Sequence, residues 1–311
     1  AKWAEERSVT WVDLVYDLIV GAGFIQVGDG LAGSVDGTGG LVFCGVFVPL
    51  WTAWTGFTFF ANRFTVDDIL HRVMVFLQMF AVGGMALSAP EVLRGQHVPF
   101  ALATAGALFI IALLHYRVHQ QTEEGRDYCF FWGGVFLVSS IGWLASAFVM
   151  AHIAYWIWAA ATVTILGAPL HRRSRELAER YPIDFEHLGE RYGLLTLIVL
   201  GESFVKVLSL LATEGAGLDV YAQAAVVLLV TCGVWWVYFD DVAGAHVLKG
   251  PAKWVVWPHA HLPPHAAIVA LGRALTQPAV PTWSEPRRAR TTGSAARPRA
   301  RARLRRAMSA R

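Results

Sequence analysis

Eight blocks of about twenty apolar residues follow one another through roughly the first 240 positions of this sequence. A helix needs about twenty predominantly apolar residues to cross a bilayer, whose hydrocarbon core is about 30 Å thick. In lipid the backbone must satisfy its own hydrogen bonds, so we interpret each block as a helix. The pattern predicts spans near residues 9–30, 41–61, 70–88, 98–116, 129–148, 152–170, 192–212 and 221–239. A ninth apolar stretch, 254–272, is broken by three prolines.

The composition supports a membrane protein over the soluble classes. The residues AVILMFWYC make up 55% of the chain and charged residues 16%, whereas soluble domains carry about 25% charge. This argues against a soluble enzyme, a disordered regulator and a secreted disulfide scaffold. The three cysteines lie inside apolar blocks without CxxC spacing, so we interpret them as packing residues. The predicted fold class is an all-α polytopic transmembrane bundle.

The distribution of Lys and Arg between alternating loops predicts the orientation. Thirteen of these residues fall on the side of the N-terminus, and Arg94 alone falls on the opposite side. Because cytoplasmic loops carry the excess of positive charge, the N-terminus is predicted to be cytoplasmic. The predicted location is therefore the cytoplasmic membrane of a cell, with several passes.

The C-terminal segment 273–311 differs sharply from the body of the chain. Residues 1–272 hold 15 Lys/Arg against 22 Asp/Glu, a net −7, whereas 273–311 hold 11 Arg against one Glu, a net +10. We therefore do not take the basic balance as a sign of nucleic-acid binding. The segment is predicted to be a disordered basic tail. Either the ninth stretch is re-entrant and leaves the tail cytoplasmic, or the Ala/Arg-rich tail is a non-native continuation, as from a shifted reading frame.

Charged residues inside the predicted spans are the main candidates for function, because a charge in hydrocarbon is costly and usually faces the bundle interior or water. Asp13 and Asp17 are four residues apart and share one helix face. Glu202 and Lys206 have the same spacing in the span 192–212 and could neutralise each other. We predict that these four residues line an ion or solute pathway. The alternative is that they form structural hydrogen bonds and ion pairs between helices.

A second set of polar residues lies at the predicted cytoplasmic ends of the spans. It comprises Asn62, Arg63, Asp67, Asp68, Arg72, His187, Glu190, Arg191 and Asp240. The HxxE spacing from His187 to Glu190 is half of a metal motif, and the three histidines of the ninth stretch are interrupted by prolines. We therefore predict neither a metal site nor a cofactor.

Several segments together resemble the bacterial low temperature requirement A (LtrA) family of membrane proteins. They are TWVDLVYDLIV, FFANRFTVDDILHR, ERYGLLTLIVLGESFVKVL, WWVYFDDVAG and AHLPPHAAIVALG, in this order over about residues 8–272. Motif positions include most of the candidates above, together with Gly201 and Ser203. The resemblance implies a bacterial membrane protein and further spans beyond this point, but assigns no role to any residue.

Three hypotheses remain open at this stage. We favour a transporter or channel for a small ion or solute, in which the first and seventh spans meet around a polar cavity. A membrane enzyme would act on a lipid headgroup with the cytoplasmic cluster, which should then converge in a cleft. A structural or sensory protein would pair every buried charge, for example Asp17 with Arg63 or Arg191, and leave no cavity.

The remaining expectations concern partners and internal repetition. The expected partners are the lipid bilayer and a small ion or solute, without nucleic acid, and homo-oligomerisation is left open. Acid–Arg pairs precede both the first and the seventh span, and a carboxylate follows each Arg ten or eleven residues later. This spacing is compatible with a six-helix repeat followed by the start of a second, parallel repeat.

Overall fold

The computed structural model describes residues 2–3, 9–30, 37–66, 68–213, 217–242 and 253–275. All of them belong to one compact unit that extends over 1–276. The tail 273–311, on which the sequence predicted disorder, lies almost wholly outside the described residues. That prediction therefore remains a prediction.

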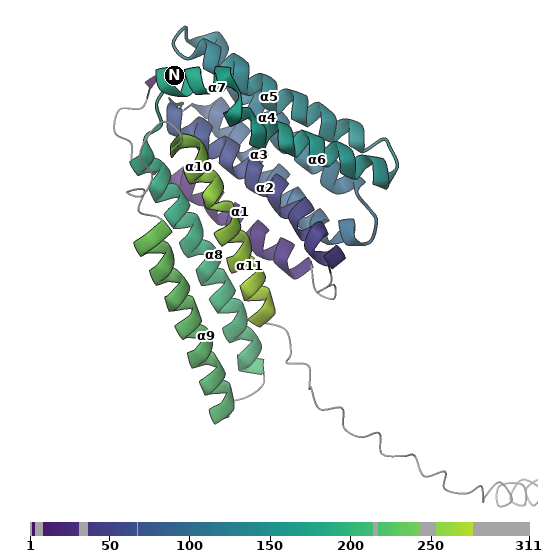
Figure 1. The fold of residues 1–311 in the computed structure, drawn as a ribbon, viewed down its shortest axis with the longest axis vertical. Helices are drawn as coiled ribbons and strands as arrows, with labels where there is room; N and C mark the ends of the chain where they lie inside the picture. The colour runs from purple at the N-terminus through teal and green to yellow at the C-terminus, as the bar shows by residue number, and fades with distance from the viewer. Residues whose placement is uncertain are drawn as a thin grey trace, which may run out of the picture. The chain divides into compact units, whose positions relative to one another are not determined.

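The described part of the chain is built from helices (Figure 1). The main helices are α1 (Trp11–Gly30), α2 (Gly37–Arg63), α3 (Ile69–Leu93), α4 (Val98–Gln121), α5 (Arg126–Ser146), α6 (Ala151–Gly167), α7 (Arg172–Arg180), α8 (Phe185–Thr213), α9 (Leu218–Val237), α10 (Lys253–Ala260) and α11 (Leu262–Leu275). Two short helical turns, η1 (Ala168–Leu170) and η2 (Tyr238–Val242), follow α6 and α9. Two antiparallel two-residue strands, β1 (Lys2–Trp3) and β2 (Phe64–Thr65), join the N-terminus to the end of α2.

Eight of the described helical segments are long and apolar enough to cross a membrane. They coincide with the eight predicted spans, so the all-α polytopic fold is confirmed. The ninth stretch forms two shorter helices, α10 and α11, that meet at His261. Pro263 and Pro264 lie in the first turn of α11, where the missing N–H groups cost least, and Pro258 lies inside α10.

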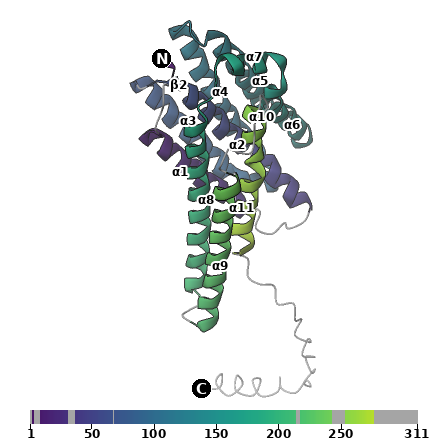
Figure 2. The ribbon, with the colours of Figure 1, turned by 60° about the vertical axis from the view of Figure 1, so that its left-hand side comes forward.

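The first helix lies at the centre of the packing. It contacts α3 on one side and α8 and α11 on the other (Figures 1 and 2). A Cβ added at Gly21 would lie 2.5 Å from the side chain of Ile198 in α8, and one at Gly28 would lie 2.7 Å from Val269 in α11. Glycine therefore permits the close approach of these helices, as membrane interfaces commonly require.

Helix α9 is the least enclosed of the spans. It runs along α8 in both views, and most of its apolar side chains are exposed (Figures 1 and 2). A helix in the bilayer can leave such a surface to lipid, because lipid tails are as apolar as leucine.

Candidate functional site

Asp13 and Asp17 lie on the inner face of α1 and are both buried, with 3% and 0% of their surface exposed. Their spacing of four residues places them one turn apart on a helix, as the sequence predicted. Burying two ionised carboxylates is costly unless cations and hydrogen-bond donors compensate them. The groups that surround them therefore decide what they can do.

The compensating cation is Arg191, which α8 brings against α1 and which is completely buried. Its Nε and Nη2 atoms lie 2.7 and 2.6 Å from the two carboxylate oxygens of Asp17, a bidentate arrangement. Its Nη1 atom lies 2.7 Å from Oδ1 of Asp13. Such forked, charge-assisted hydrogen bonds are the strong ones in proteins. The sequence left the partner of Asp17 open between Arg63 and Arg191, and the structure selects Arg191.

Uncharged donors add further hydrogen bonds to both carboxylates. The indole N–H of Trp54 donates to Asp17 over 2.7 Å. The hydroxyl of Thr10 donates to Asp13 over 2.7 Å, and its backbone N–H donates over 3.1 Å. We call Asp13, Asp17 and Arg191 the charge triad. Two carboxylates and one guanidinium give it a formal charge of −1.

Next to the charge triad, Asn62 at the end of α2 binds the start of α8. Its amide nitrogen donates to the carbonyl oxygen of Asp184 over 2.8 Å and lies 3.1 Å from Nδ1 of His187. Its amide oxygen accepts from the N–H of Asp184. The carboxylate of Asp184 in turn accepts from the N–H groups of residues 186 and 187, which caps α8. These contacts set the position of α8, and with it that of Arg191.

Arg63 occupies a different environment, although it is also buried, with 2% exposure. Its Nε and Nη1 atoms lie 3.4 Å from the carbonyl oxygens of Tyr181 and Phe59. Its guanidinium carbon lies 4.7 Å from the ring centre of Tyr128 and 5.5 Å from that of Phe59. Among the described residues, no carboxylate pairs with it.

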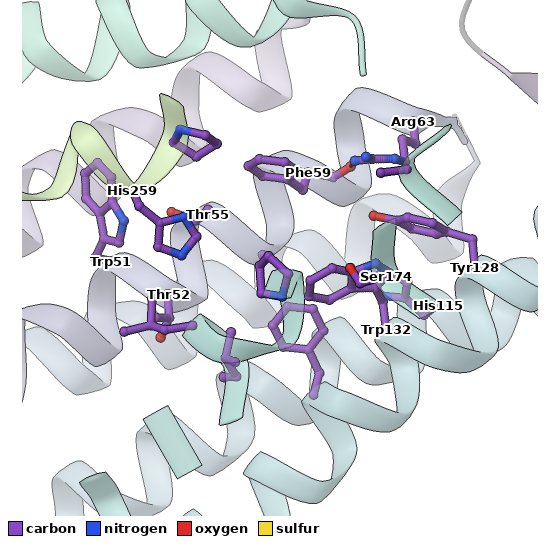
Figure 3. Close-up of a pocket in the computed structure, with 17 residues that line it drawn as sticks. Trp51, Thr52, Thr55, Phe59, Arg63, His115, Tyr128, Trp132, Ser174 and His259 are labelled. Atoms are coloured by element: carbon purple, nitrogen blue, oxygen red, sulfur yellow. Dashed lines mark hydrogen bonds between the residues drawn. The ribbon is translucent and has the colours of Figure 1, made fainter. Parts of the chain in front are cut away.

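A cavity of about 60 Å³ adjoins Arg63. It is lined from α2, α4, α5, α6, η1, α7 and α10. Its polar lining residues are Thr52, Thr55, Arg63, His115, Tyr128, Ser174 and His259 (Figure 3). The other walls are mainly aromatic and aliphatic. We call this space the Arg63 cavity.

The described contacts bear on two of the hypotheses about this arrangement. The first and seventh spans were expected to enclose a polar cavity, but α1 and α8 meet directly through the charge triad. The Arg63 cavity lies beside α2 instead, and α1 contributes none of its lining. The structural hypothesis required paired charges without a cavity, so it explains the triad but not this space.

The second expected charge pair is also arranged differently. Within the described residues, the ion-pair partner that the structure gives Lys206 is Asp29, at the far end of α1 from the triad. Glu202 is exposed on α8, and the space around a Cβ at Gly201 is open. Gly201, a motif position, therefore permits no close helix contact within this part of the chain. The i to i+4 spacing failed as a guide because α1 offers Lys206 a competing carboxylate.

The remaining polar residues do not converge in one cleft. Asp68 caps α3 by accepting from the N–H of His71 and forms an ion pair with Arg117. The hydrogen bond from Arg117 lowers the pKa of Asp68 to about 2. Arg72, Glu190 and Asp240 are exposed, and Asp67 lies outside the described residues. The lipid-enzyme hypothesis required these groups to meet, and the described contacts distribute them over several places.

Sequence reasoning overlooked four residues that matter here, namely Trp54, His115, Tyr128 and Ser174. Each lies in or beside an apolar helix and carries no spacing signal of its own. The one weak sequence signal for these residues is that each is a polar side chain that precedes or interrupts an apolar run. Which of them share a space depends on how α2, α4, α5 and α7 pack, and local sequence does not reveal this.

Comparison with known proteins identifies the family. A family model described as "Bacterial low temperature requirement A protein (LtrA)" matches residues 8–296. The chain belongs to the LtrA family. The match confirms the resemblance and continues into the basic C-terminal segment. The LtrA protein described here is therefore a multi-pass membrane protein of a bacterial family.

A curated relative is named "Uncharacterized protein RA0937" and comes from Rhizobium meliloti (strain 1021). It is 25% identical over 248 residues, which cover 76% of this chain and 59% of the relative. The chain thus spans less than two thirds of the relative's length. No solved structure matches this LtrA protein.

Proposed function

We propose that this LtrA protein is a transporter or channel for a small ion or solute, and that its charge triad takes part in ion coupling. The observation that carries the proposal is that two buried carboxylates of one span share the guanidinium of Arg191. A carboxylate at this position can take up and release a proton or a small cation. Ionisable groups at membrane depth commonly mark such pathways.

Asp13 is the member of the triad that is better suited to exchange an ion. Asp17 holds three strong donor contacts, two from Arg191 and one from Trp54. Asp13 receives one guanidinium nitrogen of Arg191 and also contacts Thr10, which precedes α1 at the end of the span. We infer that Asp13 binds and releases the ion, while Asp17 keeps Arg191 in position.

A flux assay in liposomes tests the proposal. The purified full chain is reconstituted, and gradients of H⁺, Na⁺, K⁺ and a panel of organic solutes are applied to the wild type, Asp13→Asn and Asp17→Asn. The expected result is flux that Asp13→Asn lowers by about tenfold or more, since it removes the carboxylate that would bind the ion. Asp13→Asn retains a hydrogen-bonding side chain and leaves the Arg191–Asp17 pair in place.

Glu202→Gln is the matched control, because Glu202 is an exposed carboxylate on the same helix as Arg191. It should leave the flux unchanged. Folded wild type that conducts nothing under any gradient would overturn the proposal and favour a structural or sensory role, for which the complete pairing of Asp17 is the supporting observation. Equal flux in wild type and Asp13→Asn would remove the triad from the pathway.

A further inference from the structure

We infer that the Arg63 cavity is a binding site for a compact oxyanion, with a phosphate group as the ligand chemistry. The inference rests on two observations that neither the family match nor the triad explains. A buried arginine has no carboxylate partner among the described residues, and a cavity of matching size adjoins it. The inference that phosphate is a transported substrate rests on the proposed transport function. The inference that the cavity binds phosphate does not depend on that function.

The two buried arginines of the bundle provide the comparison. Arg191 is surrounded by two carboxylates within 2.7 Å. Arg63 is also buried, but its contacts are the hydroxyl of Tyr128, carbonyl oxygens at 3.4 Å and the faces of two aromatic rings. An arginine side chain keeps its charge in proteins, and a buried charge without a counter-ion is costly. The missing counter-charge at Arg63 is the one that a bound anion would supply.

The cavity contains a second donor group that lacks a partner. The hydroxyl of Ser174 is buried and forms no hydrogen bond within the described residues. Figure 3 shows Arg63, Tyr128, His115 and Ser174 on one side of the space, whereas Trp51, Thr52 and Thr55 lie on the other side. A guanidinium and a hydroxyl are donors that phosphate oxygens accept from, and the guanidinium fork matches their geometry.

The size and the walls of the cavity restrict the ligand. A volume of about 60 Å³ holds about four water molecules, which suits a compact oxyanion better than a sugar or a nucleotide. Trp132, Phe136 and Ile165 form apolar walls, and a low dielectric strengthens the attraction between a guanidinium and an anion. The same positive charge disfavours a cation in this space.

Helix α7 covers the cavity and adds positive charge beside it. Its buried face consists of Ser174, Leu177 and the partly buried Ala178, of which Ser174 and Ala178 line the cavity. Its exposed face carries four arginines and two glutamates, a net charge of +2. Arg173, Arg180 and the neighbouring Tyr181 all bind Asp127 at the start of α5, which holds α7 in place. A positive surface raises the local concentration of anions at the place where they would enter.

Equilibrium binding of radiolabelled inorganic phosphate to the purified full chain in detergent tests the inference. The expected result is saturable binding of one phosphate per chain, weakened by about tenfold or more in Arg63→Gln because the charged fork is lost. Arg63→Lys should bind more weakly than wild type, because an ammonium group cannot bind in a bidentate manner. Ser174→Ala removes one hydroxyl with little risk to folding and should weaken binding by about threefold to tenfold.

Arg117→Gln is the matched control for the loss of an arginine, since Arg117 pairs with Asp68 outside the cavity. It should bind phosphate as the wild type does. Equal phosphate binding by wild type, Arg63→Lys and Ser174→Ala would overturn the assignment of the cavity, even if Arg63→Gln does not fold.

The source of the phosphate group is distinguished in nanodiscs of phosphatidylcholine, with and without phosphatidic acid, by native mass spectrometry. Binding of free phosphate identifies a soluble anion. Retention of phosphatidic acid by wild type but not by Ser174→Ala or Arg63→Lys, without binding of free phosphate, identifies a lipid headgroup. Folded wild type that binds neither overturns the inference.

These outcomes separate the inference from the proposed function. Phosphate binding without any flux, including flux under a phosphate gradient, would support the site and reject transport. Cation flux that depends on Asp13, without binding of either phosphate or phosphatidic acid, would support transport and reject the site.

Discussion

Arg191 of α8 donates two hydrogen bonds to the carboxylate of Asp17 in α1, over 2.7 and 2.6 Å. Both residues are completely buried. The two residues are 174 positions apart in the chain. Their contact fixes the rotation of α1 relative to α8, because a bidentate pair forms in a narrow range of orientations. The charge triad is therefore part of the interface between α1 and α8.

Removing the cation of the triad should destabilise the protein strongly. Arg191→Ala leaves two buried carboxylates without a counter-charge, and breaking a buried ion pair costs about 3–5 kcal/mol. Arg191→Lys should fall between this variant and the wild type, because it keeps the charge but loses the fork. Thermal unfolding midpoints in detergent measure both effects. Equal midpoints for Arg191→Ala and wild type would show that the pair does not support the fold.

The indole hydrogen bond of Trp54 can be removed with little loss of packing. Trp54→Phe keeps an aromatic ring among its neighbours but leaves Asp17 with one donor fewer. A hydrogen bond to a charged group contributes about 1.5–3 kcal/mol, so the unfolding free energy should fall by that amount. Trp51→Phe is the control, since Trp51 also contacts Tyr192 but does not bind Asp17. A similar decrease in unfolding free energy in both variants would show that the effect comes from lost packing and not from the hydrogen bond.

The contact between α1 and α8 should not tolerate a methyl group at Gly21. A Cβ there would lie 2.5 Å from Cγ2 of Ile198, and overpacking of this kind costs about 1–3 kcal/mol. Gly201→Ala on α8 is the matched control, because its Cβ would meet open space. Adding Ile198→Ala to Gly21→Ala should restore part of the loss. Thermal unfolding of the wild type and the three variants measures this, and equal stability of the Gly21 and Gly201 variants would contradict a close contact.

The ion pair between Asp68 and Arg117 should weaken in acid. The pKa of Asp68 lies near 2 in the folded protein, below its ordinary value of 3.8, so the pair stabilises the fold above pH 4. This contribution is lost as the pH falls through about 2. Asp68→Asn can still cap α3 but cannot form the ion pair. Its unfolding midpoint should lie slightly below that of wild type at pH 6, and the difference should vanish near pH 2. A difference in unfolding midpoint that persists near pH 2 would show that it comes from the helix cap and not from the ion pair.

The sequence predicted the spans well, because the bilayer imposes its length and polarity on each segment separately. It also placed Asp13 and Asp17 on one helix face, since a period of 3.6 residues needs no tertiary information. Lys206 shows the limit of this reasoning. Its i to i−4 neighbour Glu202 was the obvious partner, yet the structure pairs it with Asp29 of another helix.

The sequence by itself determined that this LtrA protein is a polytopic helical membrane protein with charges at membrane depth. Both properties follow from local composition and helical periodicity. Only the tertiary structure decided that Arg191 neutralises Asp17 while Arg63 stays without a carboxylate partner among the described residues and faces a cavity. The physical reason is that ion pairing depends on which helices are neighbours and how each is rotated. Those choices arise from packing between residues far apart in the chain, such as Gly21 against Ile198, and not from the hydropathy of any one segment.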